Sequence, residues 1–239
     1  MVNHQSVSGG GAFTRIFIAN RGAIAARIVR ACRELGIPSV VVYTSVDAMA
    51  PYVANADEAY PLTGLRPNDS YLDQDQLMSI AELSKADAVH PGYGFLSENA
   101  VFAQRVIDAD MHFIGPAPTW LDRMGDKVNA RRLMAQRGMP TFAGSDLITD
   151  VDSAREAAEH IGFPLVVKPS GGGGGMGMQV VEHMGDLEAA LVQAQAVADA
   201  AFANGGLYLE RWIEKPRHIE YQILADEHGN AMHLFEREC

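Results

Sequence analysis

A glycine-rich segment is the first candidate for chemistry in this sequence. Six glycines fall within residues 171–177, and Lys168 precedes them by three positions, at the end of the apolar run 165–167. Without a Cβ, backbone amides can approach phosphate oxygens closely, and glycine accepts the positive φ angles that such a loop needs. The pattern predicts a phosphate-binding flap beside a cation. A plain linker between two strands is the alternative.

The glycine run fits neither of the two common nucleotide-binding motifs. Gly172, Gly174 and Gly177 have the spacing of the dinucleotide fingerprint, but that fingerprint opens a helix, whereas residues 178–181 have the pattern of a strand. A P-loop needs Lys-Ser or Lys-Thr directly after the glycines, and the sequence has neither pair there. The interpretation that remains is a glycine flap between two strands.

A second cation, Lys127, follows Gly125 and Asp126 at the expected start of a helix. Free backbone amides at a helix N-terminus attract anions, and Asp126 is the expected cap of this helix. A solvated surface charge is the usual role of a single lysine. Only four lysines occur in the chain, against fifteen arginines, and two of them flank candidate phosphate sites.

Two polar segments near the end of the sequence are candidates for contacts to a base and a sugar. Residues 210–213 stand at the end of a predicted strand, whose edge offers backbone groups to an adenine, while the Glu210 carboxylate accepts from an amine or a ribose hydroxyl; an ordinary strand end is the alternative. In the next predicted strand, alternation places His218, Glu220 and Gln222 on one face and an apolar set opposite them. Such an arrangement is typical of a strand with one polar face and one core face.

A loop with two aromatic residues follows another predicted strand. Within residues 90–99, Tyr93 and Phe95 stand on either side of Gly94. The loop leaves the carboxyl end of a parallel strand, which is where α/β sheets bind ligands. A tight turn with Ser97 as the cap of the next helix is the structural alternative, and both interpretations can hold together.

Alternating strand and helix patterns predict an α/β fold with a parallel sheet in the first part of the chain. The expected strands lie near residues 16–19, 39–43, 58–62, 88–90 and 112–114. Helices are expected near 24–35, with Leu35 on its inner face, and near 73–84 and 98–109. A helical connector, broken near Gly125, leads to a second unit with helices at 151–161 and 187–201, strands at 164–169, 178–181 and 207–212, and a hairpin over 217–236.

The composition argues against several classes of protein. Hydrophobic residues make up 48% and charged residues 21%, close to the average of folded domains, and no run approaches the roughly 18 apolar residues of a membrane span. A net charge of -11 argues against nucleic-acid binding. Cys32 and Cys239 cannot form a disulfide framework or a zinc cluster. Residues 1–12 indicate a disordered leader rather than a signal peptide, so a cytoplasmic protein is expected.

Five segments, in this order, resemble the biotin carboxylases of the ATP-grasp superfamily. They are residues 18–22 (Ile-Ala-Asn-Arg-Gly), 90–99, 125–127, Lys168 with the glycine run, and 216–218, and the resemblance spans residues 14–239. It implies a Rossmann-like parallel sheet, followed by an ATP-grasp lid and a truncated start of the ATP-grasp body. The implied boundaries are a leader at 1–12, an N-terminal domain at 13–125, a connecting helix at 126–139, a lid at 140–212 and the start of the C-terminal subdomain at 213–239.

The resemblance also implies site residues. Those implied to bind ATP are Lys127, Lys168, Gly174, Gly175, Glu210, Arg211, Trp212, Ile213 and His218. Those implied to bind biotin are Tyr93, Gly94 and Phe95. The first helix resembles part of the family's dimer surface through its charged residues Arg27, Arg30 and Glu34.

The activity implied by the resemblance is ATP-dependent carboxylation of biotin on a carrier protein or domain. Bicarbonate is the carbon source, carboxyphosphate the intermediate and Mg²⁺ the metal, and the reaction is the first half-reaction of an acyl-CoA or pyruvate carboxylase. The implied partners are a biotin carboxyl carrier protein or domain, a carboxyltransferase subunit or domain and, in the complete protein, a second copy in a homodimer. The sequence does not indicate whether the acceptor is acetyl-CoA, propionyl-CoA, another acyl-CoA or pyruvate.

The sequence departs from the family pattern at two positions and at its end. Ala23 stands where the family usually has Glu, and Met176 stands where a basic residue is common in the glycine run. The family's metal ligands, bicarbonate-binding residues and catalytic base lie beyond Cys239, so no catalytic or metal-binding residue, and no carboxylase activity, is expected from these 239 residues alone. Two alternatives stay open: another ATP-grasp ligase, such as a carbamoyl-phosphate-synthase-like enzyme, and a non-catalytic nucleotide-binding or dimerising remnant.

Overall fold

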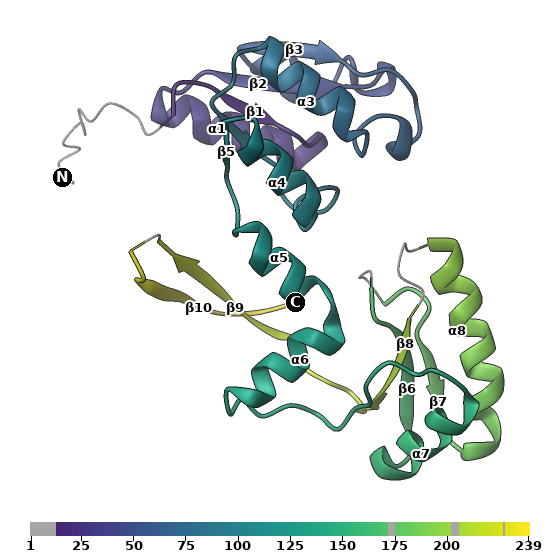
Figure 1. The fold of residues 1–239 in the computed structure, drawn as a ribbon. Helices are drawn as coiled ribbons and strands as arrows, with labels where there is room; N and C mark the ends of the chain where they lie inside the picture. The colour runs from purple at the N-terminus through teal and green to yellow at the C-terminus, as the bar shows by residue number, and fades with distance from the viewer. Residues whose placement is uncertain (1–12, 172–174, 202–205, 227) are drawn as a thin grey trace. The chain divides into compact units, whose positions relative to one another are not determined.

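The chain divides into two compact units, residues 1–130 and residues 131–239. The structure is a computed structural model that describes residues 13–171, 175–201, 206–226 and 228–239 (Figure 1). Gly174 and the expected leader at 1–12 therefore lie outside the described residues. No helix in the described ranges is long and apolar enough to cross a membrane.

The first unit is built on a five-stranded parallel sheet with the order β3-β2-β1-β4-β5. The strands are β1 (Ile16–Ile18), β2 (Ser39–Tyr43), β3 (Glu58–Pro61), β4 (Ala88–His90) and β5 (His112–Phe113). From β1 the chain builds outward through β2 and β3, then returns to the other side of β1 with β4. The switch of direction between β1 and β4 is the point at which open α/β sheets bind ligands.

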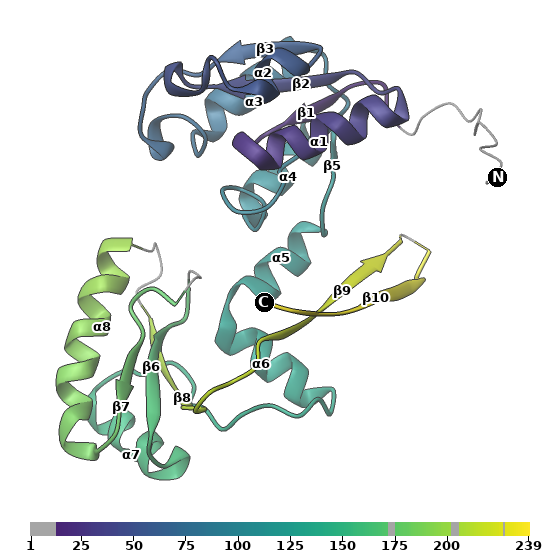
Figure 2. The ribbon, with the colours of Figure 1, turned by 180° about the vertical axis from the view of Figure 1, so that it is seen from behind.

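Helices cover both faces of this sheet, as a comparison of Figures 1 and 2 shows. Strand alternation sends Ile16 and Ile18 into a core with α1 (Gly22–Leu35) and α2 (Pro51–Asn55). Phe17 points the opposite way, into a core with α3 (Gln74–Leu83) and α4 (Ala100–Asp108). The predicted parallel α/β sheet is confirmed.

Local chemistry sets where the helices of this unit begin and end. Gly36 ends α1 in the left-handed conformation, with φ of +70°, which glycine adopts without a Cβ clash. Leu35 is 73% exposed, so its predicted inward position is wrong: it belongs to the last turn, past the part of α1 that packs on the sheet. The predicted cap Ser97 is also wrong, because the Asn99 side chain accepts from the Phe102 amide at 2.8 Å and caps α4.

Short elements complete the first unit, and the helix α6 crosses the division between Ala130 and Arg131. The 3-10 helices η1 (Ser45–Asp47) and η2 (Pro67–Asp69) precede α2 and α3. The expected break near Gly125 separates α5 (Pro118–Gly125) from α6 (Lys127–Gln136), and the Asp126 carboxylate caps α6 by accepting from the Asn129 amide at 2.8 Å.

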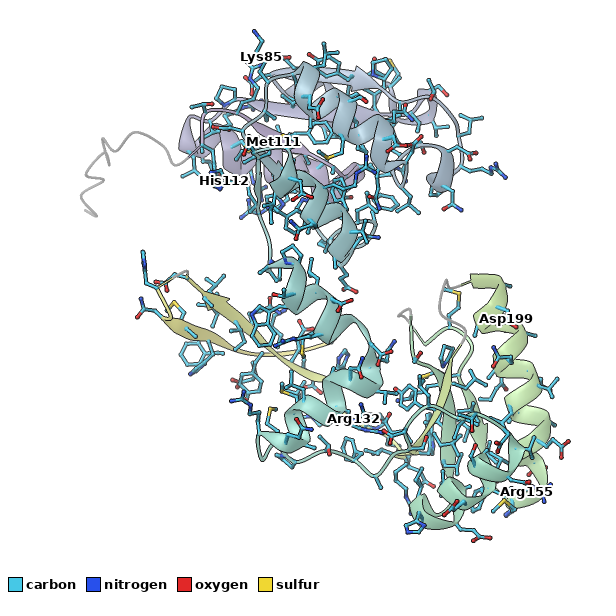
Figure 3. All side chains as sticks on the ribbon, in the orientation of Figure 1. Lys85, Met111, His112, Arg132, Arg155 and Asp199 are labelled. Atoms are coloured by element: carbon cyan, nitrogen blue, oxygen red, sulfur yellow. The ribbon has the colours of Figure 1, made fainter. Side chains whose placement is uncertain are left out.

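The second unit contains an antiparallel sheet with the order β7-β6-β8. Its strands are β6 (Leu165–Pro169), β7 (Gln179–Val181) and β8 (Leu207–Arg211). The helices α7 (Val151–Ile161) and α8 (Leu187–Ala201) pack on the same face, where Leu165, Val167 and Leu209 meet Ala158 and Leu191. The 3-10 helix η3 (Met184–Asp186) leads into α8, and Arg155 on α7, labelled in Figure 3, forms an ion pair of 3.5 Å with Glu188 on α8.

The chain ends in an antiparallel hairpin of β9 (Ile219–Ala225) and β10 (Ala231–Glu238). The register shifts between His233 and Glu236, which marks a bulge in β10. Ile219, Tyr221 and Ile223, the apolar face predicted from alternation, are 39%, 59% and 62% exposed. The hairpin was predicted correctly, but these apolar side chains are not buried in the described structure.

Asp57 ties the amino end of β2 to the chain before β3. Its Oδ2 accepts from the Ser39 amide and the Ser39 hydroxyl, each at 2.8 Å, and this bonding to the ionised form holds the pKa of Asp57 below its usual range. Because the folded-state pKa is the lower one, the stabilisation is present above the unfolded-state value of about 3.9 and is lost as pH falls through the folded-state pKa.

We therefore expect Asp57→Asn to lower the unfolding free energy of the first unit at pH 7, by roughly 1 kcal/mol. The difference from the unsubstituted protein should shrink as the pH is lowered past about 4, because the unfolded-state carboxylate takes up a proton first and the folded-state carboxylate follows at lower pH. Urea denaturation at pH 7 and pH 3 measures both quantities. An equal difference at the two pH values would contradict the assignment.

Candidate functional site

Two opposite charges meet on the face of the β7-β6-β8 sheet that lies opposite α7 and α8. Because Val167 and Leu209 point into the helical core, alternation turns Lys168 and Glu210 to the other face. Lys168 Nζ forms an ion pair with Glu210 Oε2, and the two side chains are only 25% and 18% exposed. A partly buried cation thus stands at the end of β6, three positions before the glycine run.

The start of the glycine run has an unused polar group beside this cation. The Ser170 side chain is buried, and its Oγ has no hydrogen-bond partner among the described residues, while its amide donates to the Gly206 carbonyl at 2.8 Å. A buried hydroxyl without a partner is costly, and an anion at the glycine run would satisfy it. The residues at the end of β6 therefore fit a phosphate group.

Two described glycines of the run, Gly175 and Gly177, occupy positions that do not suit a residue with a side chain. Gly175 and Gly177 have φ angles of +74° and +77°. A Cβ on Gly177 would lie 3.1 Å from Pro169 Cγ and 3.2 Å from Val197 Cγ1, on α8. At Gly177 the chain therefore passes close to both the end of β6 and α8.

The strand β8 is hydrogen-bonded along both edges until it ends at Arg211. The Arg211 amide donates to the Ala143 carbonyl at 2.9 Å, and the Trp212 amide donates to the Pro164 carbonyl at 3.1 Å. Among the described residues, none bonds to the Arg211 carbonyl or the Ile213 amide. At the strand end the Arg211 carbonyl is thus an acceptor and the Ile213 amide a donor. They match the edge of an adenine ring, where an amine donates and a ring nitrogen accepts.

Arg131, on α6, contacts both β8 and the segment beside it at 143–148, and was missed in the sequence. Its guanidinium contacts the Ser145 carbonyl and lies 5.7 Å from the centre of the Tyr208 ring. Gly144 makes room for it, since a Cβ there would lie 1.7 Å from Arg131 Nη1 and 2.9 Å from the Leu209 carbonyl. Its neighbour Arg132, labelled in Figure 3, pairs with Asp146 at 2.8 Å.

Two of the predicted ATP-binding residues lie outside the β7-β6-β8 sheet that carries Lys168. Lys127 is the first residue of α6, as predicted, but it belongs to the first unit. His218 lies just before β9, where its side chain is exposed and its carbonyl accepts from the Cys239 amide at 3.1 Å. Their roles stay predictions.

The predicted biotin-binding loop lies at the switch point between β1 and β4. Asn20, after β1, donates from Nδ2 to the Pro91 carbonyl at 2.7 Å and to the Tyr93 carbonyl at 3.0 Å. Gly92 has φ of +68°, and its amide donates to His90 Nδ1 at 3.1 Å. Burial lowers the pKa of His90, so the ring is neutral at pH 7 with its proton on Nε2.

The two aromatic residues of the loop differ in their surroundings. Tyr93 is 72% exposed, whereas Phe95 is 37% exposed and stacks on Tyr71 at 5.4 Å between ring centres and 8° between planes. Phe95 also has φ of +43°, an unfavourable backbone angle for a residue with a side chain. The loop therefore presents Tyr93 and Gly94 to solvent while Phe95 is held against the unit.

Comparison with known proteins decides the family. Residues 12–121 match the family model "Biotin carboxylase, N-terminal domain", and residues 126–239 match the model "Carbamoyl-phosphate synthase L chain, ATP binding domain". The chain belongs to the biotin carboxylase family. The two matched segments together account for nearly all of the sequence.

Curated relatives agree with this assignment. Biotin carboxylase 2 of Bacillus subtilis is 46% identical over 95% of this chain and 51% of the relative, and biotin carboxylase of Haemophilus influenzae is 46% identical over 94% and 51%. The chain spans about half the length of these relatives. Human mitochondrial pyruvate carboxylase is 48% identical over 94% of this chain and 19% of its own length.

Solved biotin carboxylases share the fold. The biotin carboxylase domain of Hydrogenobacter thermophilus 2-oxoglutarate carboxylase, a dimer in complex with MgADP, ADP and bicarbonate, has a TM-score of 0.93 and 42% identity over 96% of this chain and 51% of its own. Biotin carboxylase of Campylobacter jejuni, solved as a nucleotide complex, has a TM-score of 0.92 and 40% identity over 95% and 51%. The predicted fold class is thereby confirmed.

Proposed function

We propose that this chain supplies the nucleotide-binding lid and the biotin-binding loop of an ATP-dependent biotin carboxylase. The observation that carries the proposal is the Lys168 ammonium, held at the end of β6 by Glu210, three positions before the glycine run. In the proposed reaction, ATP phosphorylates bicarbonate, and the carboxyl group then passes to biotin on a carrier protein or domain. The carrier, a carboxyltransferase and a homodimeric partner belong to the proposal, as does a cytoplasmic location.

The chain's own residues divide the binding of ATP between three groups. The Lys168 ammonium and the glycine-run amides offer positive charge and N–H donors to phosphate oxygens, to which the Ser170 hydroxyl adds a further donor. The Arg211 carbonyl and the Ile213 amide take the adenine edge. In the proposed site, Lys127, Gly174, Gly175, Glu210, Trp212 and His218 complete the set.

The biotin part of the proposal depends on the loop at the switch point of the first unit. Its exposed Tyr93 and Gly94 offer an aromatic surface and an open backbone to the ureido ring, with Phe95 behind them. A carbamoyl-phosphate-synthase-like ligase is the alternative enzyme. The first family model and the names of the curated relatives favour biotin.

Magnesium would neutralise the phosphate charge when bound. In the described part of the chain, no group of three or more His, Cys, Asp or Glu side chains is arranged to hold a metal ion. The residues present therefore do not by themselves fit a metal centre, and no step of the proposed chemistry is assigned to one in this chain.

The protein that carries these residues should cleave ATP only when bicarbonate is present, and faster when free biotin is added. Phosphate release in the presence of Mg²⁺, with each substrate omitted in turn, measures this dependence. Cleavage that requires bicarbonate and ammonia but ignores biotin would support the carbamoyl-phosphate-synthase-like alternative instead. Tight ATP binding without turnover under every condition would favour a non-catalytic nucleotide-binding protein.

A further inference from the structure

A buried polar cluster in the first unit has no part in the proposed nucleotide site. Asp47, the last residue of η1, is 8% exposed and contacts Arg21 with both carboxylate oxygens, Nε to Oδ2 at 2.6 Å and Nη2 to Oδ1. The Arg21 guanidinium holds the pKa of Asp47 below its usual range, so the carboxylate is ionised at neutral pH. A buried charge of this kind can hold neighbouring side chains in place.

Asp47 fixes the hydroxyl of Tyr71. This hydroxyl lies 2.6 Å from Asp47 Oδ2 and accepts from the Thr44 amide at 3.1 Å. An ionised carboxylate can only accept, so the hydroxyl proton must point to Asp47. Tyr52 donates to the Val42 carbonyl at 3.1 Å and approaches the same hydroxyl at 3.3 Å. With its hydroxyl bound on several sides and only 4% of its surface exposed, Tyr71 has a fixed ring plane.

The fixed ring of Tyr71 is the surface on which Phe95 stacks. The rings are almost parallel, at 8°, with centres 5.4 Å apart. Phe95 holds φ of +43°, which an unsupported residue would leave for a more favourable angle. The stacking therefore opposes the relaxation of the loop at this residue.

The loop is held at its backbone as well as at its ring. Asn20 donates to the Pro91 and Tyr93 carbonyls, and the next residue, Arg21, reaches Asp47. Asn20, which follows β1, thus contacts the loop directly. Arg21 is linked to the loop indirectly, through Asp47 and Tyr71. Tyr93, the exposed aromatic residue, is held at its own carbonyl by Asn20, and only Gly94 separates it from Phe95.

We propose that Asn20, Asp47 and Tyr71 are positioning residues of the loop at 93–95, with Asn20 fixing its backbone and Asp47 fixing Phe95 through Tyr71. The positioning itself is a property of the first unit. Its consequence for biotin rests on the proposed function. The experiments below separate the two.

Hydrogen exchange tests the positioning without any substrate. The Gly92 amide is bound to His90 Nδ1 and the Ser97 amide to the Gly94 carbonyl, so both report on loop opening. Asp47→Asn and Tyr71→Leu should speed exchange at these amides at least about fivefold, and Tyr71→Phe, which keeps the ring, should have a smaller effect. The matched control is Asp57→Asn, the same change at a carboxylate that bonds Ser39, at the opposite ends of the strands.

Kinetics of the protein with biotin carboxylase activity test the consequence. Asp47→Asn should raise the KM for free biotin about tenfold with kcat within about twofold, because the loop loses preformed shape and the chemical step is untouched. Tyr71→Leu should do the same, Tyr71→Phe should recover much of the loss, and the KM for ATP should not change. Asp57→Asn should leave the KM for biotin as it is.

Two results would overturn the proposal. One is loop exchange in Asp47→Asn and Tyr71→Leu that is no faster than in Asp57→Asn, which would make the cluster a general stabiliser. The other is an unchanged KM for biotin together with faster loop exchange, which would remove the positioning role in biotin binding. Activity that does not depend on biotin in the unsubstituted protein would instead refute the proposed function, and the exchange measurements would still decide whether the cluster holds the loop.

Discussion

Replacing Lys168 by Gln should weaken ATP binding roughly ten- to a hundredfold. Lys168 is the one cation described at the end of β6, and a charge-assisted contact to phosphate contributes about 1.5–3 kcal/mol, more than a neutral amide can recover. The effect should be large because the side chain is only 25% exposed, so water and salt screen it less than a surface lysine. Calorimetric titration of ATP into the protein at fixed ionic strength measures the change.

Lys85→Gln is the matched control for this experiment. It removes the same charge from an exposed position after α3, at Lys85 in Figure 3, and should leave ATP affinity within about twofold. Because Lys168→Gln also leaves the Glu210 carboxylate without its partner, circular dichroism must first show that the variant is folded. A folded Lys168→Gln protein that binds ATP with unchanged affinity would remove Lys168 from the phosphate site.

The order of helices and strands was predictable because its cause is local. Alternation and the helical period come from neighbouring residues, and α7 (Val151–Ile161) lies where a helix was expected, near residues 151–161. The prediction failed where contacts with residues distant in sequence decide whether a side chain is buried. Leu35 has the helical period of α1 but lies beyond the part that packs, and the exposure of the hairpin's apolar face depends on what covers it rather than on its pattern.

The candidate site was predictable only in part, for the same reason. The glycine run and Lys168 are adjacent in sequence, so their combination could be recognised. The contact between Lys168 and Glu210 joins residues 42 positions apart, and it depends on the antiparallel register of β6 and β8. The only sign of the Arg131 contact in the sequence is Gly144, which leaves room for the guanidinium. The roles of Tyr71 and Asp47 could not be predicted, since a single tyrosine or a single aspartate forms no sequence pattern.

Replacing Phe102 by Ala should lower the unfolding free energy of the first unit by about 3–5 kcal/mol. Phe102 lies on α4, is fully buried, and packs in the core with Phe17 and edge-on against Phe113 at 6.3 Å. Removing the ring leaves a cavity between α4 and the sheet that a β-strand backbone cannot fill by a small shift. A loss of this size is a large part of the stability of an ordinary domain.

The measurement must separate the two units, because a chain with two compact units need not unfold in one step. Native-state hydrogen exchange does so: amides of β1 and β2 should lose protection in Phe102→Ala, while amides of β6 in the second unit should keep theirs. Val101→Ala, at the neighbouring residue on α4, is the control, since Val101 is 65% exposed and its truncation should cost less than about 0.5 kcal/mol. Equal losses for the two variants would mean that α4 is not packed as described, and loss of protection in β6 would mean that the two units are energetically coupled. Protection lost only in β1 and β2 would show that the sheet carrying the aromatic loop has a stability of its own, independent of the second unit.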